Sequence, residues 1–189
     1  MERALIVSHT EKSIAFFTEM LQAASCDPIL LVGSGAEARR LLLEQEVDLV
    51  LINAPLRDES GETLAREIAG GGASQVLLVV RSGDFEAVSS VTEGDGVLTV
   101  AKPLNKALFW SALKLALAAQ NRVRHLRDEN SKLTQKIADI RMIDRAKCIL
   151  ISFLNISEQE AHRYIEKQAM DLRTTRRAVA EAILKTYEE

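Results

Sequence analysis

Apolar and polar positions alternate along the first part of the chain in a pattern typical of an α/β domain. Five short apolar runs are each followed by a longer segment in which apolar residues recur at helical spacing. Strands buried on both faces read as continuous apolar runs, and parallel strands need helical crossovers between them. The pattern therefore predicts a flavodoxin-like domain at residues 1–120, with a parallel sheet whose ligand site lies at the carboxyl ends of its strands. The predicted strands are residues 4–7, 28–32, 48–52, 76–80 and 96–100.

A long helix is predicted after this domain. The chain contains neither proline nor glycine after Pro103, and helix-forming residues dominate. We therefore expect the last helix of the first domain to continue unbroken into residues 120–140. Apolar side chains recur along it at heptad spacing, which predicts a coiled coil over residues 116–141. The a positions are Ala116, Val123, Asn130 and Ile137, and the d positions are Ala119, Leu126, Leu133 and Ile140.

Asn130 indicates how this coiled coil assembles. A buried asparagine at an a position pairs well with its own copy in a parallel, in-register dimer and poorly in other arrangements. We therefore predict a parallel homodimer. The alternative is that the apolar stripe packs on the protein's own sheet, but the five-stranded domain is already complete before Val123. The predicted dimerisation residues are Val123, Leu126, Asn130, Leu133, Ile137 and Ile140.

The C-terminal part predicts three short helices, at residues 141–154, 157–170 and 175–187. Ser157 and Glu160 have the spacing of a capping box, and Thr174 or Thr175 can cap the last helix. Each helix carries an apolar stripe with small side chains, which allows close packing. The stripes are Ala146, Ile149, Leu150 and Phe153, then Ala161, Tyr164, Ile165 and Ala169, and finally Val179, Ala182 and Ile183.

Charge is distributed unevenly over a chain whose formal net charge is -3. Residues 1–120 hold 10 basic and 16 acidic side chains, whereas residues 121–189 hold 14 basic and 11 acidic ones. A polyanion is therefore expected to meet the C-terminal part. The composition, 47% hydrophobic and 27% charged, is that of a soluble globular protein.

Several classes of protein are disfavoured by the remaining composition. The longest apolar run near the middle, residues 113–119, is interrupted by Lys114 and is far shorter than the roughly 20 residues of a membrane span. Neither a secretory leader nor a disulfide framework is indicated, so we expect a cytoplasmic protein without membrane partners. The cysteines and histidines are scattered, so no zinc site and no nucleophile–base pair can be assembled from them. They are Cys26, Cys148, His9, His125 and His162.

Residues 1–120 resemble the receiver domain of bacterial response regulators, as found in two-component systems. The resemblance is carried by the apolar strand at residues 5–7, the strand at 48–52, the turn at Gly61, and Ala-Lys-Pro-Leu at 101–104. It implies transfer of a phosphoryl group to an aspartate at the end of the third strand, with Mg²⁺ held by an acidic pair after the first strand.

The chain departs from the receiver pattern at the positions that carry this chemistry. Asn53 occupies the acceptor position, and an amide is too weak a nucleophile to replace a carboxylate. Ser8-His9-Thr10 stands where receivers carry acidic residues, so a hard cation lacks its oxygen anions. The other departures are Val80 at the hydroxyl position and Thr99 at the aromatic switch position. We therefore predict a pseudo-receiver that is not an enzyme, with no catalytic residue, no cofactor and no metal.

Two further features of this region have alternative interpretations. Lys102 either makes a relic phosphate contact or is a surface lysine before a helix-starting proline, and the second reading is favoured. Asp58, Glu59 and Glu11 lie near the same strand ends and could hold a metal in a shifted arrangement, although charged loops at sheet edges are commonplace.

The predicted output domain, residues 130–189, resembles the ANTAR domain, the RNA-binding output module of transcription antiterminators, over about residues 130–185. The resemblance runs through residues 143–150, 157–161, 168–171 and 179–183 without gaps. It implies that the dimer binds paired stem-loops of an mRNA leader, one hairpin per protomer, and thereby disfavours a downstream terminator. Cys148 is a departure, because the family usually has glycine there.

Basic side chains in this region can contact phosphates and stack on unpaired bases. The candidate RNA-binding residues are Arg141, Arg145, Lys147, Arg163, Lys167, Arg173, Arg176 and Arg177. Aromatic candidates are few, because Tyr164 fits an apolar stripe and Tyr187 lies near the end of the chain. Both are interpreted as structural or incidental.

Regulation without phosphorylation requires another signal, and we expect a sensor protein or a small ligand to supply it. Two other function classes remain open. A three-helix output could place a helix in a DNA groove, although no helix-turn-helix glycine turn is visible. Alternatively, the chain is a non-catalytic interaction scaffold, in which case function is insensitive to changes at Lys147 and Arg173.

Overall fold

The structure is a computed structural model that describes residues 2–187 and forms two compact units. The first unit extends to Arg124 and the second begins at His125, and each is described by itself. The last two residues of the output domain predicted at 130–189, and residue 1 of the first domain, lie outside the described residues. Among residues 2–187, no helix combines the length and apolar character needed to cross a membrane.

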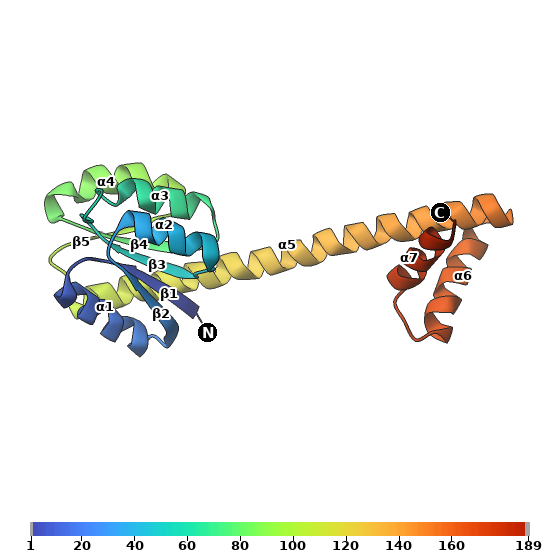
Figure 1. Ribbon diagram of the computed structural model, residues 1–189, viewed down its shortest axis with the longest axis horizontal. Helices are drawn as coiled ribbons and strands as arrows, with labels where there is room; N and C mark the ends of the chain where they lie inside the picture. Colours follow the sequence, from blue (N-terminus) through green and yellow to red (C-terminus); the bar gives the residue numbers. More distant parts are fainter. Residues whose placement is uncertain (1, 188–189) are drawn as a thin grey trace. The chain divides into compact units, whose positions relative to one another are not determined.

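A five-stranded parallel sheet forms the centre of the first unit, with the order β2-β1-β3-β4-β5 (Figure 1). This confirms the predicted flavodoxin-like fold, and every strand begins and ends within two residues of its predicted bounds. Because β1 and β3 are neighbours, the turns that follow them meet at one edge of the sheet. The strands are β1 (Glu2–Val7), β2 (Cys26–Val32), β3 (Leu49–Asn53), β4 (Gln75–Val80) and β5 (Leu98–Ala101).

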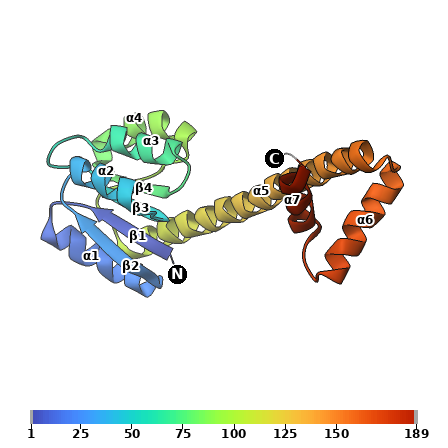
Figure 2. The ribbon, with the colours of Figure 1, turned by 45° about the vertical axis from the view of Figure 1, so that its right-hand side comes forward.

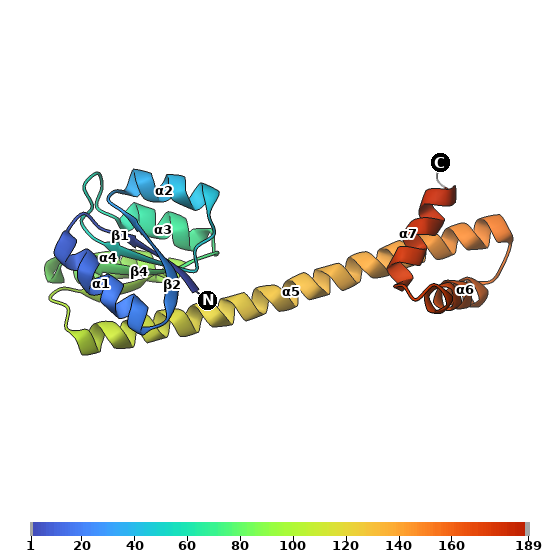
Figure 3. The same cartoon turned by 60° about the horizontal axis from the view of Figure 1, so that its bottom comes forward.

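Helices cover both faces of this sheet, as Figure 3 shows. Ala4 and Ile6 of β1 point to the face covered by α1 (Glu11–Ala23) and by the first turns of α5 (Lys106–Leu154). Leu5 and Val7 point to the opposite face, because successive side chains of a strand alternate between faces. That face is covered by α2 (Gly35–Glu44), α3 (Glu62–Gly70) and α4 (Phe85–Thr92), with short 3₁₀ helices η1 (Ser82–Asp84) and η2 (Glu93–Asp95) on either side of α4.

Helix α5 (Lys106–Leu154) is continuous over 49 residues, which confirms the predicted unbroken helix. Its first turn is capped by Asn105, whose Oδ1 accepts the backbone N–H of Leu108 at 2.7 Å. The expectation that Pro103 starts this helix is therefore wrong, because the helix begins three residues later, at Lys106.

The beginning of α5 is held on the sheet of the first unit. Phe109, Leu113 and Ala116 are fully buried there. The side chain of Gln120 donates to the carbonyl of Ala73 at 3.0 Å, and Arg124 pairs with Asp48. The prediction that Ala116 lies in a dimer seam is thus wrong, because its side chain is already buried in the apolar core of the first unit.

The second unit is a three-helix arrangement of the last turns of α5, α6 (Glu158–Asp171) and α7 (Arg176–Tyr187) (Figure 2). The predicted capping box is confirmed, because the Ser157 hydroxyl accepts from the Glu160 N–H while the Glu160 carboxylate accepts from the Ser157 N–H. Thr175 also caps α7, since its hydroxyl accepts the N–H of Ala178 at 3.2 Å. The core consists of Ala146, Leu150, Ala161, Ile165, Ala169, Val179, Ala180 and Ile183.

Three residues of the predicted apolar stripes are exposed, and a fourth, Ile149, is partly buried against this core. Phe153 is 63% exposed and Tyr164 is 43% exposed. Ala182 is also exposed, and Ala180 takes its place in the core. A helical stripe predicts which side of a helix is buried, but a narrow three-helix core covers only its centre, so residues at the stripe's edge remain in solvent.

Gly61 provides a test of the loop that leads into α3. Its φ of +91° is unfavourable for residues with a side chain, and a Cβ there would lie 3.2 Å from Cγ2 of Ile52. We expect Gly61→Ala to lower the free energy of unfolding by about 1–2 kcal/mol, measured by urea titration. Gly70→Ala is the matched control, because a Cβ at Gly70 meets nothing within 4 Å in the last turn of α3. An unchanged stability of Gly61→Ala would contradict this account.

Candidate functional site

The carboxyl end of the sheet carries an uncharged cluster where receivers carry acidic residues. Asn53, the last residue of β3, is only 4% exposed. Its Nδ2 donates to the hydroxyl oxygens of Ser8, at 3.0 Å, and Thr10, at 3.2 Å. Its Oδ1 is buried and has no hydrogen-bond partner among the described residues. The cluster therefore offers amide and hydroxyl groups, and no carboxylate nucleophile, at this edge of the sheet.

The acidic residues near this cluster are bound to α2. The carboxylate of Asp58 accepts the backbone N–H groups of Gly35 and Ala36 at 2.9 and 3.0 Å, which lowers its pKa. The carboxylate of Glu59 pairs with Arg39. Within residues 2–187, no three histidine, cysteine, aspartate or glutamate side chains are arranged to hold a metal ion. Asp58 and Glu59 therefore fix the loop after β3 to the N-terminus of α2.

Lys102 is positioned by the same loop. Its Nζ donates to the carbonyl of Ala54 at 2.6 Å, and burial, followed by the nearby Arg81, lowers its pKa. It is half-buried, so the interpretation as a simple surface lysine is incomplete. Thr99, at the aromatic switch position, is hydrogen-bonded to Thr92 at 3.1 Å. The ammonium group thus ties the end of β5 to the loop that follows β3.

We expect that Asn53→Asp does not restore phosphorylation. The new carboxylate would be buried beside Ser8 and Thr10, which supply no anionic oxygen for Mg²⁺. Intact-mass spectrometry after incubation with acetyl phosphate and Mg²⁺ should show no phosphoryl adduct on the wild type or on this variant. A variant that adds Ser8→Asp and His9→Asp is the positive arm. An adduct on Asn53→Asp alone would show that other groups hold the metal.

The predicted dimerisation residues form an exposed stripe along residues 123–140 of α5. Val123 is 36% exposed, and Leu126 and Ile137 are each 52% exposed. Leu133 and Ile140 are 59% and 58% exposed. The fractional exposure of these side chains is high for aliphatic residues at regular spacing. Asn130 is exposed on the same stripe, where its Oδ1 accepts from the hydroxyl of Thr134.

Three of the candidate RNA-binding residues are engaged in ion pairs within the second unit. Lys147 contacts Asp144 at 2.7 Å and Glu158 at 3.3 Å, and its side chain is only 14% exposed. Its hydrogen bond to Asp144 is the main reason why its pKa is raised. The pair with Glu158 joins α5 to α6. A phosphate at Lys147 would have to compete with both carboxylates.

Arg177 and Arg176 make similar contacts from α7. Arg177 pairs with Glu181 of its own helix and, at 2.7 Å, with Asp139 of α5. Arg176 pairs with Glu166 of α6 at 3.1 Å, and its side chain remains 55% exposed. These ion pairs join neighbouring helices, so both residues have a structural role whatever else they contact.

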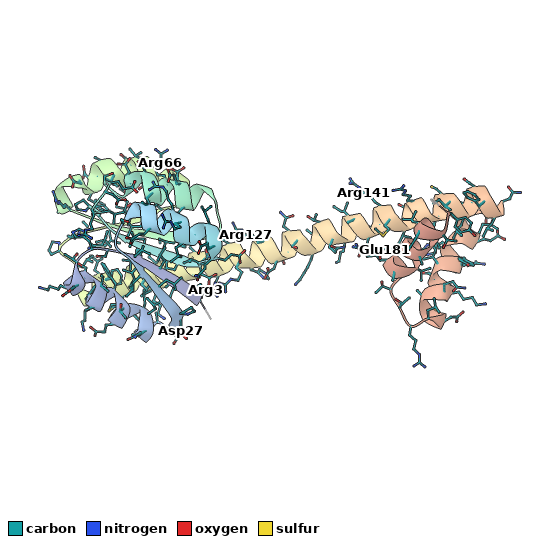
Figure 4. The ribbon with its side chains drawn as sticks, in the orientation of Figure 1. Arg3, Asp27, Arg66, Arg127, Arg141 and Glu181 are labelled. Atoms are coloured by element: carbon teal, nitrogen blue, oxygen red, sulfur yellow. The ribbon has the colours of Figure 1, made fainter. Side chains whose placement is uncertain are left out.

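The remaining candidates are exposed. Arg141, Lys167 and Arg173 form no ion pair with any residue between 2 and 187, and Figure 4 draws Arg141 on the α5 helix. Arg163 lies near Glu160, whose pKa it helps to lower after the larger effect of Ser157. Arg145 is exposed on α5. Cys148, the departure from the family pattern, is exposed as well.

One surface feature could not be expected from the sequence. A groove of about 550 Å³ lies between α6 and α7 and is lined partly by Tyr164 and Tyr187. The helical pattern assigned Tyr164 to the apolar stripe, and only the packing of α6 shows that its ring is exposed. Tyr164 and Gln168 are four residues apart, and this spacing was the one sign in the sequence that an aromatic and an amide side chain share a face of α6.

Comparison with known proteins gives one match to the C-terminal part and one to nearly the whole chain. Residues 131–184 match the ANTAR domain family. The chain is 25% identical over 185 residues to the transcriptional regulatory protein PdtaR of Mycobacterium tuberculosis, a match that covers 97% of this chain and 90% of that protein.

Solved receiver domains share the fold of the first unit. The signal receiver domain of an HD domain-containing protein from Pseudomonas fluorescens superposes with a TM-score of 0.58 at 22% identity, covering 66% of this chain and 92% of that one. The receiver domain of a Luxo repressor protein from Vibrio parahaemolyticus gives a TM-score of 0.57 at 19% identity, covering 67% and 95%. Together, these findings show an ANTAR domain at residues 131–184 and the fold of a receiver domain in the first unit, in a chain that is similar along most of its length to a transcriptional regulatory protein.

Proposed function

We propose that the protein is an RNA-binding transcription antiterminator. The observation that carries this proposal is that the ANTAR match, residues 131–184, falls on a compact helical unit with exposed basic side chains. The match and the likeness to a transcriptional regulatory protein along 97% of the chain support transcription regulation of the antiterminator type. The second unit of each protomer binds one hairpin loop of an mRNA leader in the cytoplasm, and binding prevents a terminator from forming.

The protein acts as a parallel homodimer in this proposal. The exposed stripe from Val123 to Ile140 is the surface that a second copy covers, and its heptad spacing supports this assembly. Two copies then present two RNA-binding units to two hairpins of one transcript. Linking two binding events in this way raises the overall affinity without any new contact.

Control of the dimer comes from a sensor protein or a small ligand, since Asn53 stands at the acceptor position. The protein needs no catalytic activity, metal or cofactor of its own for this function. The uncharged cluster of Asn53, Ser8 and Thr10 supports the proposal, because it offers no carboxylate that could accept a phosphoryl group.

A binding experiment tests the proposal directly. Purified full-length protein is titrated against a tandem-hairpin RNA, a single hairpin and a matched DNA duplex, over a salt series and without a phosphodonor. We expect tight binding to the tandem RNA and weaker binding to the single hairpin. The logarithm of the binding constant should fall linearly with the logarithm of the salt concentration. A preference for the duplex would favour the DNA-binding alternative, and no binding to any nucleic acid would favour the scaffold alternative.

A further inference from the structure

The groove between α6 and α7 has an unusual lining for a protein surface. Tyr164, Gln168 and Leu172 line it from α6 and its end, at helical-turn spacing. Ala178 and Ala182 line it from α7 at the same spacing, and the connection between the helices contributes Thr174. Among residues 2–187, no charged side chain lines the groove. It is therefore an uncharged slot with an aromatic wall, two small alanine side chains and several polar groups.

Tyr164 is placed to stack rather than to fill the core. Ala161 and Ile165 occupy the buried side of α6, and Tyr164 remains 43% exposed beside them. Among the described residues, neither the side-chain amide of Gln168 nor the hydroxyl of Thr174 makes a hydrogen bond. An exposed ring with free donors and acceptors nearby can bind a planar group that has polar edges.

Positive charge lies directly beside this groove. Thr174 also lines a second depression, of about 590 Å³, together with Arg173 and Arg176. Glu166 lines this depression too, and its carboxylate is already paired with Arg176. Arg173 forms no ion pair with the described residues and lies between two residues of the groove, Leu172 and Thr174. A neutral slot and a free guanidinium group are thus adjacent on one surface.

We propose that this groove receives one unpaired base of the RNA loop, stacked on Tyr164, while Arg173 contacts the adjoining phosphate. The inference rests on the proposed function and deepens it, because it names the subsite for a single nucleotide. A base is uncharged, planar and polar at its edges, which matches the groove, and its phosphate is anionic, which matches Arg173. Gln168 and Thr174 lie where they can contact the edge of the base.

The test uses the full-length protein and hairpin RNA in which 2-aminopurine replaces one loop base at a time. Stacking on Tyr164 should quench the fluorescence at one loop position when protein is added. We expect Tyr164→Ala to abolish this quenching and to weaken binding about 5- to 100-fold. Tyr164→Phe should retain both, because stacking needs the ring and not the hydroxyl. Leu154→Ala, which removes a half-exposed apolar side chain outside the groove, is the matched control.

The outcomes separate this inference from the proposed function. If the wild type does not bind RNA, both fail. If the wild type binds but Tyr164→Ala binds and quenches equally well, the groove is not the base site and the proposed function stands. A loss shared by Tyr164→Phe would overturn stacking. A shift of Tyr164→Ala from dimer to monomer in light scattering would instead identify the groove as a contact between copies of the chain.

Discussion

Leu133→Glu should convert the protein to a monomer and weaken its binding to a tandem-hairpin RNA by about a hundredfold. Leu133 occupies a d position, and its side chain is 59% exposed in the single chain. A parallel dimer would bury this leucine against its own copy, whereas two glutamates there would bring like charges into an apolar seam. Light scattering measures the molar mass, and gel shifts with tandem and single hairpins measure the two affinities.

The single-hairpin affinity distinguishes loss of the dimer from loss of the RNA-binding surface. It should stay within about twofold of the wild-type value, since one protomer holds one hairpin in this account. Ser131→Glu adds the same charge at an exposed b position two residues away and should leave the dimer intact. If Leu133→Glu remains dimeric, the copies meet through another surface. If it is monomeric but binds the tandem RNA unchanged, the two hairpins do not need two linked protomers.

The sheet was predictable because its strands are buried on both faces. Leu49, Val50, Leu51 and Ile52 are all fully buried, so the sequence there is continuously apolar and the strand's end falls at Asn53. Because β3 ends at Asn53 and pairs with β1, Asn53 lies at the carboxyl end of the sheet, beside the turn after β1. The departure from receiver chemistry could therefore be predicted from single residues at known positions on strands.

Contacts between distant residues could not be predicted in the same way. Lys147 pairs with Glu158 across two helices, and Arg177 pairs with Asp139, 38 positions earlier in the chain. Sequence patterns report the period of a helix but not how far a neighbouring helix lies from each turn. Basic residues that look equivalent in the sequence therefore separate, in the structure, into paired and unpaired ones.

Ala116 illustrates a second limit of the sequence. A small apolar residue at heptad spacing suits both a coiled-coil seam and a helix packed on a sheet. Its complete burial in the first unit comes from the seating of the first turns of α5 against the sheet. The exposed part of the stripe begins one heptad later, at Val123. Packing on the sheet thus holds for the first turns of α5, and the dimer stays a prediction for the part that begins at Val123.

Arg173→Gln should weaken RNA binding about tenfold and reduce the salt dependence of binding by about one released counterion per protomer. The guanidinium of Arg173 forms no ion pair with the described residues, so its loss removes no contact within the fold. Glutamine preserves most of the side-chain length, and the φ of +51° at this position is no less favourable for it than for arginine. The free energy of unfolding should therefore remain unchanged.

Lys147→Met is the matched comparison, because its ammonium is already bound by Asp144 and Glu158. We expect this variant to lose up to about 1 kcal/mol of unfolding free energy. Its effect on RNA affinity should be smaller than that of Arg173→Gln. Affinities measured between low and moderate salt give the slope for each variant, and urea titration gives the stability. Equal losses of RNA affinity would mean that RNA displaces both carboxylates from Lys147. A loss at Lys147 alone would place the phosphate contact at the junction of α5 and α6 instead of at the connection between α6 and α7.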